Sequence, residues 1–304
     1  MRLWIDTDIG SDVDDALTLA YALRHDEIEV VGISTVFGDV ALRTEIAKTL
    51  LALEARSDVP VVTGLGAPLA SQRKGRMFGH EGLGILRDPS PQMKVLSDPD
   101  ADETLQALAS AMTSARPEAV LAIGPMTNLG ALARDGFRLP PLTVMGGKLT
   151  DIQIPGASPH IPEWNWWCDP KAVSLILESP CATAPRVIPI DVTWGTTLPE
   201  EDWQGLAQAG PLGEALTVLC EQWLTTLKEK FRAKSPRIHL HDPLAAMTLV
   251  DSEVCRFDSL KIRMDPEGIV DHESGGAVVE AALEVDEMRL RKALLRTWHG
   301  EPRG

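Results

Sequence analysis

The sequence is poor in cysteine and in positive charge, and each shortage excludes a class of protein. Its 304 residues include four cysteines, and their spacing contains no C-x-x-C pair of the kind that builds a zinc or redox site. We therefore expect buried thiols at Cys168, Cys181, Cys220 and Cys255. Acidic residues outnumber basic ones by 44 to 29, which gives a net charge of -15. Because this charge repels polyanions, nucleic acid is not an expected partner.

Long apolar runs are also missing. No stretch approaches the roughly 20 residues that cross a bilayer, and the N-terminal MRLWIDTDIG reaches charged residues before a signal-peptide core could form. We therefore expect a cytoplasmic protein with no membrane contact. The apolar fraction of 44% and the charged fraction of 24% lie in the globular range, so the chain can bury a sizeable core.

Short apolar runs alternate with helical patterns along the chain. The runs RLWID, EVVGISTVFG, VPVVTG, AVLAIG, LTVMGG and RVIPIDVT are apolar throughout, as strands buried on both faces are. Their alternation with helices predicts an α/β fold with a mostly parallel central sheet flanked by helices. The expected helices span residues 16–25, 41–56, 103–115, 127–135, 170–178, 214–233, 243–250 and 287–298.

The chain contains no internal repeat and no linker, so we expect a single domain over residues 1–304. Residues 71–100 are rich in Gly, Pro, Ser and charge, and are too long for an ordinary connection, which predicts a functional loop or lid. Between residues 251 and 285, the pieces SLKIRM and GAVVEAALEV flank a Gly-rich polar stretch. This pattern predicts a hairpin at the edge of the sheet near the C-terminus.

Five aspartates lie within ten residues, between the first predicted strand and the helix that follows it. They are Asp6, Asp8, Asp12, Asp14 and Asp15. Ligands of open α/β sheets bind at the carboxyl ends of strands, which is where these side chains are expected. A helix cap, worth about 1 kcal/mol, explains one or two of them but not five. A hard cation with oxygen ligands, Ca²⁺ or Mg²⁺, would neutralise the group, although the spacing of an EF-hand is not present.

The segment DTDIGSDVDDA resembles the N-terminal motif of the inosine-uridine preferring nucleoside hydrolases. Further segments resemble this family in the same order: STVFGD, GHEGLG, AIGPMTNLGAL, VMGG, PEWNWWCDPKA, DVT and HLHDPLA. The resemblance extends from Leu3 to about Met247. It implies an N-ribosyl hydrolase that splits ribonucleosides into free base and ribose, and a homodimer or homotetramer.

The resemblance also implies a Ca²⁺ ion at the bottom of the site. Its ligands map onto Asp8, Asp15, Asp242 and the backbone carbonyl of Ile123. These groups come from three distant parts of the sequence. A cation that takes six to eight oxygens would leave positions for a water molecule and for two ribose hydroxyls.

The catalytic roles follow from the same resemblance. Asp8 corresponds to the general base that takes a proton from the metal-bound water, and His241 to the group that protonates the leaving base. Asp14, Glu163 and Asn165 correspond to residues that hold the sugar hydroxyls. Because metal binding lowers the pKa of water, a carboxylate base suffices near neutral pH.

Four further residues are predicted to contact substrate: Asp39, Phe78, His80 and Trp164. Asp39 and Phe78 stand where the family has Asn and often His, and Ala157 replaces a family Asn. The differences at Phe78 and Ala157 remove polar groups from the predicted site. The identity of the base is therefore left open.

Two Asp-Pro pairs, at Asp169 and Asp242, both predict a capping Asp followed by Pro at the first helical position. What distinguishes the second is the H-x-H segment before it, because His239 and His241 would lie on one face of an extended chain. His239 is interpreted as a structural residue.

Two other functions remain open. An aspartyl phosphatase of the haloacid-dehalogenase type also has D-x-D after its first strand, and its nucleophile would be Asp6; phosphatase activity without nucleoside cleavage would favour it. A noncatalytic ribose- or Ca²⁺-binding relative is suggested by Asp39 and Phe78; tight ribose binding without turnover would distinguish it.

Overall fold

The structure is a computed structural model of the chain. It describes residues 1–69, 73, 75, 77–87, 101–151, 154, 162–179, 184–272 and 275–300. Most of the predicted lid at 71–100, together with Ala157 and Cys181, lies outside the described residues. The other three cysteines are buried thiols, as predicted.

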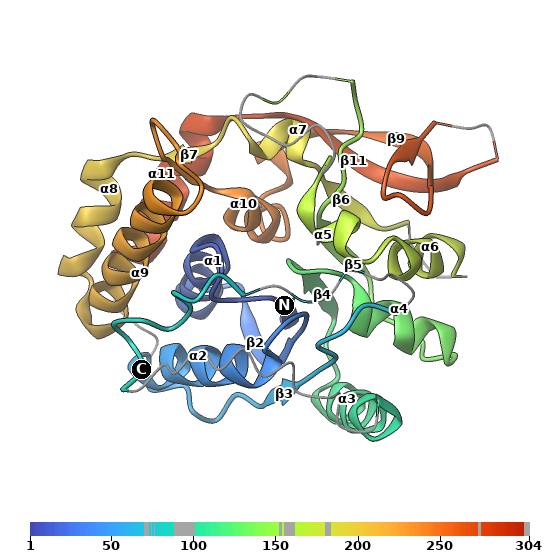
Figure 1. Cartoon of the computed structure of the whole chain (residues 1–304), viewed down its shortest axis with the longest axis horizontal. Helices are drawn as coiled ribbons and strands as arrows, with labels where there is room; N and C mark the ends of the chain where they lie inside the picture. The colour runs from blue at the N-terminus through green and yellow to red at the C-terminus, as the bar shows by residue number, and fades with distance from the viewer. Residues whose placement is uncertain are drawn as a thin grey trace.

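A mostly parallel sheet forms the centre of the fold, as the sequence predicts (Figure 1). Its strands among the described residues are β1 (Arg2–Thr7), β2 (Glu29–Thr35), β3 (Val61–Thr63), β4 (Ala119–Ala122), β5 (Leu142–Met145), β6 (Arg186–Ile188), β9 (Cys255–Met264), β10 (Val270–Asp271) and β11 (Ala277–Val285). Their order is β10-β9-β11-β6-β5-β4-β1-β2-β3. Pairing is parallel from β11 to β3, and antiparallel between β11, β9 and β10. The predicted edge hairpin is thus confirmed.

Helices cover both faces of this sheet. The described helices of the α type are α1 (Asp14–Arg24), α2 (Val40–Leu53), α3 (Ala101–Ala115), α4 (Thr127–Arg134), α5 (Trp164–Cys168), α6 (Pro170–Glu178), α7 (Ile190–Thr193), α8 (Glu200–Gly205), α9 (Gly210–Glu229), α10 (His241–Met247) and α11 (Glu287–Trp298). Figure 1 shows α3, α4 and α6 on one side of the sheet and α1, α9, α10 and α11 on the other. None of the helices built from the described residues has the length and apolar character that crossing a membrane requires.

Side chains of the central strands belong to two hydrophobic cores, because alternate side chains point to opposite faces of the sheet. In β1, Leu3 and Ile5 join the core under α1, α9 and α10, while Trp4 joins the core under α3, α4 and α6. All three side chains are fully buried. This explains why the strand sequences are apolar throughout rather than at every second residue.

Each of the eight predicted helices is present, in the predicted order, but several ends differ. The helices predicted at 170–178 and 287–298 have the observed ends. The helix predicted at 214–233 begins earlier, at Gly210, and Pro211 lies in its first turn. The helix predicted at 243–250 begins earlier, at His241. The short helices α5, α7 and α8 were not predicted, because four to six residues show no helical period. Also unpredicted is the small sheet of β7 (Thr197–Leu198) and β8 (Ile238–His239).

Strand order reverses beside β1, which pairs with β2 on one side and β4 on the other. At such a reversal the connections leave in opposite directions and open a crevice at the carboxyl ends of the strands. The loop after β1 and the residue after β4, Ile123, both lie at this edge.

Candidate active site

Buried carboxylates gather on the floor of this crevice. Asp14 and Asp15 form the first turn of α1, Asp242 lies in the first turn of α10, and Asp8 follows β1. One oxygen from each of Asp14, Asp15 and Asp242 lies within 4.8 Å of the others. The backbone N–H of Asp242 also hydrogen-bonds to the Asp14 carboxylate, which joins the two helix ends.

Burial raises the pKa of each carboxyl in this group. For Asp14, Asp15 and Asp242 the pKa lies well above its usual value, first because of desolvation and then because of the neighbouring acids. Asp12, which is half-buried on the cavity wall, has its pKa raised to about 7 by the same causes. Burial and mutual repulsion thus disfavour the charged forms of these carboxyls, and a nearby positive charge would favour them.

Oxygen is the donor element throughout this group, so its chemistry fits a hard divalent cation. The side chain of Asp15 is held by the Thr7 hydroxyl. The carbonyl of Ile123, a fourth predicted ligand, accepts a 3.3 Å hydrogen bond from the Asn165 amide. The residues present therefore fit the metal that the sequence predicts, and both Asp8 and Ile123 line the cavity above them.

A buried arginine, Arg43, holds the acidic loop from the opposite side. Its guanidinium donates to the backbone carbonyls of Asp8, Ile9 and Phe37, and to the Ser11 hydroxyl. One nitrogen lies 3.9 Å from an oxygen of Asp8, and its positive charge opposes the rise in the pKa of that carboxyl. Sequence analysis missed this residue, because an arginine within an α2 pattern gives no signal that it points inward.

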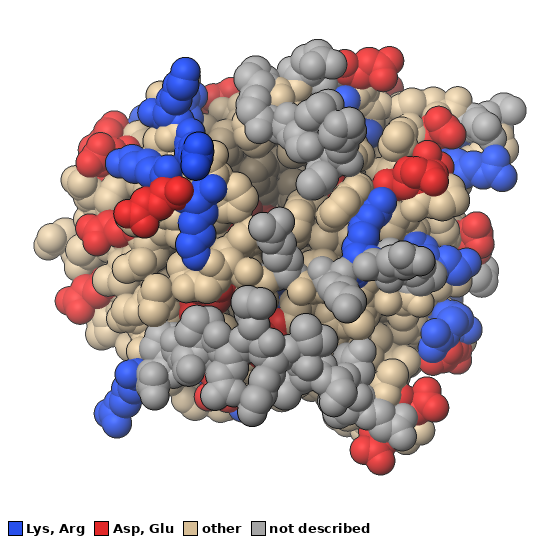
Figure 2. Space-filling view, viewed as in Figure 1, with Lys and Arg blue, Asp and Glu red and all other residues tan. Residues whose placement is uncertain are grey.

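The cavity above the acids has a volume of about 430 Å³, within the range of small-molecule sites. Its described lining residues are Asp8, Ser11, Asp12, Asp14, Asp15, Phe78, Ile123, Met145, Glu163, Trp164, Asn165, Ile190, Trp194, Trp223, Phe231, His241 and Asp242. The face of the molecule shown in Figure 2 is hollowed near its centre, and exposed Lys and Arg side chains lie around the hollow.

Aromatic rings build much of the wall. Phe78 lies 6.3 Å from Trp164 and 5.2 Å from Phe231, and Phe231 lies 6.1 Å from Trp223, measured between ring centroids. A flat, partly apolar ligand could therefore pack against this wall while polar groups of the same ligand meet the acids below. Of these residues, Trp223 and Phe231 were missed. They belong to α9 and the residues just after it, and lie outside the recognised motifs.

The segment PEWNWW brings Glu163, Trp164 and Asn165 to the cavity, as predicted. Glu163 caps α5 by accepting from the backbone N–H groups of Asn165 and Trp166, and it also accepts from Gly147 at 2.8 Å. The two glycines of VMGG make room for this turn, because a Cβ on Gly146 would lie 2.2 Å from the ring nitrogen of Trp166. The loop is therefore held rigidly against the end of β5.

His241 also reaches the cavity, as predicted. Its Nδ1 lies 2.7 Å from the Thr193 hydroxyl, and its ring packs nearly parallel to that of His239, 5.2 Å away. Burial, with a smaller effect of His239, lowers the pKa of His241 to about 3. The predicted common face of His239 and His241 is thus confirmed.

Two predicted contact residues do not appear among the described residues that line the cavity. The Asp39 carboxylate caps α2 by accepting from Leu42 N–H at 3.0 Å. His80 packs behind the wall, 5.7 Å from Trp223 and 6.3 Å from Phe78, and its Nε2 lies 2.7 Å from the Ser11 carbonyl. The other predicted site residues line the cavity together, and Asp39 and His80 are not among its described lining residues.

Several residues of the recognised motifs are structural. Asn128 of GPMTN donates to Asp6 at 2.8 Å and accepts from Leu65 N–H, which ties the ends of β1 and β3 together. Asp6 is fully buried, accepts from Ser34 as well, and has its pKa raised to about 7 by desolvation. Because Asp6 does not line the cavity, the phosphatase alternative has no accessible nucleophile.

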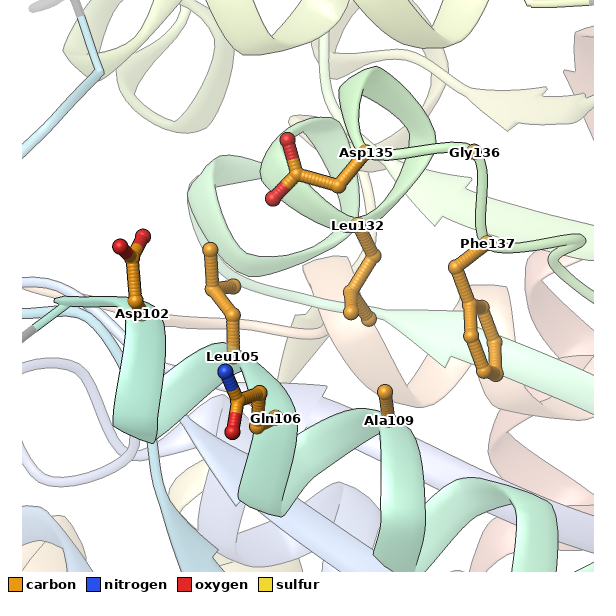
Figure 3. Close-up of a pocket in the computed structure, with 8 residues that line it drawn as sticks. All are labelled: Asp102, Leu105, Gln106, Ala109, Leu132, Asp135, Gly136 and Phe137. Atoms are coloured by element: carbon orange, nitrogen blue, oxygen red, sulfur yellow. The ribbon is translucent and has the colours of Figure 1, made fainter.

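A second hollow lies between α3 and the end of α4 (Figure 3), and its described lining shares no residue with the first cavity. It measures about 310 Å³. Its two carboxylates, Asp102 and Asp135, come from different helices, and Asp135 is bound by the neighbouring Arg134 at 2.8 Å. This hollow combines few polar groups with Leu, Ala and Phe side chains and contains no group of buried acids.

Comparisons with known proteins agree with the site. The family described as "Inosine-uridine preferring nucleoside hydrolase" matches residues 3–292. A probable uridine nucleosidase 1 of Oryza sativa subsp. japonica is 28% identical over 280 residues, which is 88% of this chain and 82% of the relative. The chain belongs to this family of nucleoside hydrolases, and it is an N-ribosyl hydrolase by class.

Solved structures show the same fold. A plant nucleoside hydrolase, the PpNRh1 enzyme, superposes with a TM-score of 0.78 at 23% identity, covering 98% of this chain and 99% of that one. A purine-preferring ribonucleoside hydrolase from Gardnerella vaginalis gives 0.77 at 23% identity, covering 99% and 98%. At these identities the likeness concerns the fold alone.

Proposed function

We propose that the chain hydrolyses the N-glycosidic bond of ribonucleosides in a calcium-dependent reaction that releases the free base and ribose. The observation that carries this proposal is one arrangement: acids from distant segments meet on the floor of a cavity whose wall is aromatic. The floor suits a sugar rich in hydroxyls, and the wall suits a planar base. Both halves of a nucleoside therefore find a matching surface.

Calcium is proposed as the metal, held by Asp8, Asp15, Asp242 and the carbonyl of Ile123. When bound, such a cation lowers the pKa of water and provides coordination positions for sugar hydroxyls. The all-oxygen donor set and the raised pKa values of these carboxyls support the assignment.

Asp8 is the proposed general base for the attacking water. Its carboxylate follows β1 at the metal floor, and Arg43 holds the backbone carbonyl of the same residue. Because a Cβ on Gly124 would lie 3.0 Å from an oxygen of Asp8, the glycine allows that carboxylate to sit close to the end of β4. A base held in this way is positioned before substrate arrives.

Asp14, Glu163 and Asn165 are proposed to hold the ribose hydroxyls. Glu163 spends three acceptor positions on backbone N–H groups, and a carboxylate has about four in all, so it keeps capacity for one hydroxyl donor. Phe78 and Trp164 are proposed to contact the base, and His241 to assist its departure. His80 is assigned only to the support of the wall, and Asp39 to the cap of α2.

The test is a panel of purine and pyrimidine ribosides and their 2'-deoxy analogues, assayed with added Ca²⁺ and after chelation. Ribosides should exceed deoxyribosides in kcat/KM by about 10⁴-fold, as sites built to hydrogen-bond a hydroxyl do. Chelation should abolish turnover, and re-addition of Ca²⁺ should restore it.

Asp8→Asn should lower turnover by about 10²-fold to 10⁴-fold, the usual loss on removing a general base. The matched control is Asp135→Asn, the same change in the hollow of Figure 3, which should leave turnover unchanged. Equal rates on ribosides and deoxyribosides, or full turnover after chelation, would refute the proposal. Tight ribose binding without turnover would instead identify a noncatalytic relative.

A further inference from the structure

Three aromatic rings form a stack beside the cavity. The ring of Trp194 lies 4.3 Å from that of His239 with an interplanar angle of 20°, and His239 lies 5.2 Å from His241 with an angle of 16°. His239 is anchored to the same segment, because its Nδ1 donates to the Trp194 carbonyl at 2.9 Å. The His239 ring, which is held by its bond to the Trp194 carbonyl, thus fixes the plane of the His241 imidazole.

The two nitrogens of His241 have different surroundings. Nδ1 lies 2.7 Å from the Thr193 hydroxyl, whereas Nε2 has no hydrogen-bond partner among the described residues. His241 lines the cavity, and its Nδ1 edge is turned to Thr193. Nε2 is therefore the atom available to a bound ligand.

The Thr193 side chain limits which nitrogen carries the proton. Thr193 is fully buried, and within the described part of the chain its hydroxyl bonds only to His241. If Nδ1 carried the proton, it would donate to the hydroxyl oxygen and leave the buried hydroxyl proton without an acceptor, which costs roughly 1–3 kcal/mol. If Nδ1 is unprotonated, the hydroxyl donates to it, and every buried group is satisfied.

We propose that Thr193 is a positioning residue that fixes His241 in its Nε2–H tautomer, so that the site presents an N–H donor, not a lone pair, to the departing base. His239 is a second positioning residue, which holds the plane of that ring. This inference rests on the proposed nucleoside hydrolysis.

The chemical benefit lies in the charge that develops on the base. When the N-glycosidic bond breaks, its electron pair moves to the base, and a fixed N–H donor stabilises that charge without reorganisation during the reaction. The opposite tautomer would point a lone pair at the same charge. The tautomer of the nitrogen that faces a ligand is set by the bond at the other nitrogen, which here is the bond to Thr193.

The first test reads the tautomer directly. The ¹⁵N spectrum of calcium-loaded protein with labelled histidines should show His241 with a protonated Nε2 and an unprotonated Nδ1, with His241→Gln assigning the signals by their loss. Thr193→Val removes the hydroxyl at nearly constant shape and should give a mixture of tautomers, while Thr193→Ser should keep the wild-type pattern. A protonated Nδ1 in the wild type overturns the inference, and this outcome does not depend on the folding of either Thr193 variant.

The second test asks whether the tautomer matters for catalysis. Thr193→Val should lower kcat for a natural riboside about tenfold, with KM little changed, and Thr193→Ser should recover most of the loss. On p-nitrophenyl riboside, whose leaving group is already stable as an anion, the same variants should match the wild type. Equal losses on both substrates would mean that Thr193 serves only the fold.

His239→Phe and His239→Ala separate stacking from other contacts. Phe keeps a flat ring beside His241 and should retain more nucleoside turnover than Ala, whereas the reverse order would overturn the role of the stack. If the wild type cleaves no riboside at all, the proposed function fails, and with it the catalytic half of this inference. The ¹⁵N spectrum would still decide the role of Thr193 in setting the tautomer.

Discussion

The helices α6 and α10 carry the same short pattern at their beginnings, DPKA at residues 169–172 and DPLA at 242–245. In α6 the aspartate is the N-cap: Asp169 accepts from Ala172 N–H at 3.1 Å, and Pro170 occupies the first helical position. In α10 the helix already begins at His241, so Asp242 lies inside the first turn and makes no cap. The expectation that both aspartates cap their helices is therefore wrong for the second.

The difference has a tertiary cause. The N-terminus of α10 faces that of α1, where the carboxylate of Asp14 accepts the Asp242 N–H. Because α10 begins at His241, the Leu244 N–H that an Asp242 cap would accept is already bonded to the Leu240 carbonyl at 3.2 Å. Released from capping, the Asp242 side chain joins the acidic group on the cavity floor. Asp169 instead satisfies Leu69 N–H at 2.9 Å and the Thr127 hydroxyl at 2.8 Å, which makes it a structural bridge. One local pattern thus produces either a helix cap or a member of the acidic group on the cavity floor, according to which segments lie opposite.

The largest expected effect comes from Asp242→Asn. Turnover should fall by about 10²-fold or more, since a bound cation supplies several kcal/mol of transition-state stabilisation. In chelator the variant should be at least as stable as the wild type, because it removes one charge from a crowded buried group whose pKa values are raised by desolvation. Kinetics at saturating Ca²⁺ and urea unfolding in chelator give the two readouts. If Asp242→Asn had a much lower free energy of unfolding than the wild type in chelator, Asp242 would act as a helix cap like Asp169.

Asp169→Asn should show the opposite combination. Asn keeps one acceptor for the cap but presents an NH₂ group where Leu69 N–H now donates, so we expect a loss of about 1–3 kcal/mol in the free energy of unfolding. Turnover per folded molecule should be retained, because Asp169 does not line the cavity among the described residues. Urea unfolding and activity measured on one preparation test this, with Asp135→Asn as control. Loss of Ca²⁺ affinity at full stability would contradict the distinction.

Much of the fold and part of the site could be predicted because they depend on local patterns. Fully apolar runs indicated strands buried on both faces, and the acids around Asp14 indicated a ligand site after the first strand. Each of these patterns spans only about ten residues. The resemblance to the nucleoside hydrolases, and not a local pattern, predicted that Glu163 and His241 belong to the same site.

The missed features depend on contacts between distant segments. Arg43 reaches back to the loop after β1. Trp223 in α9 and Phe231 just after it pack beside Phe78, from which they are more than 100 residues away in the sequence. The sequence predicts no role for Thr193 itself, because nothing in the DVT segment indicates that the Thr193 hydroxyl contacts His241. Periodicity describes which face of an element is buried, and it does not say which partner covers that face.

The smallest expected effect belongs to a third capping aspartate, Asp39, which stands where the family has Asn. Asn caps helices about as well as Asp, and it keeps the oxygen that accepts from Leu42 N–H at 3.0 Å. Asp39→Asn should therefore change the free energy of unfolding by no more than about 0.5 kcal/mol, with a slight loss because a negative charge favours the helix N-terminus.

Ca²⁺ affinity and the KM for a riboside should stay at their wild-type values, since Asp39 does not belong to the described cavity wall. Calorimetric Ca²⁺ titration and steady-state kinetics decide the matter, with Asp242→Asn as the contrasting variant. If Asp39→Asn altered either constant severalfold while stability was kept, Asp39 would contact the ligand in the bound state. The prediction of substrate contact at this residue would then be correct, and a cap and a ligand would be combined in a single carboxylate.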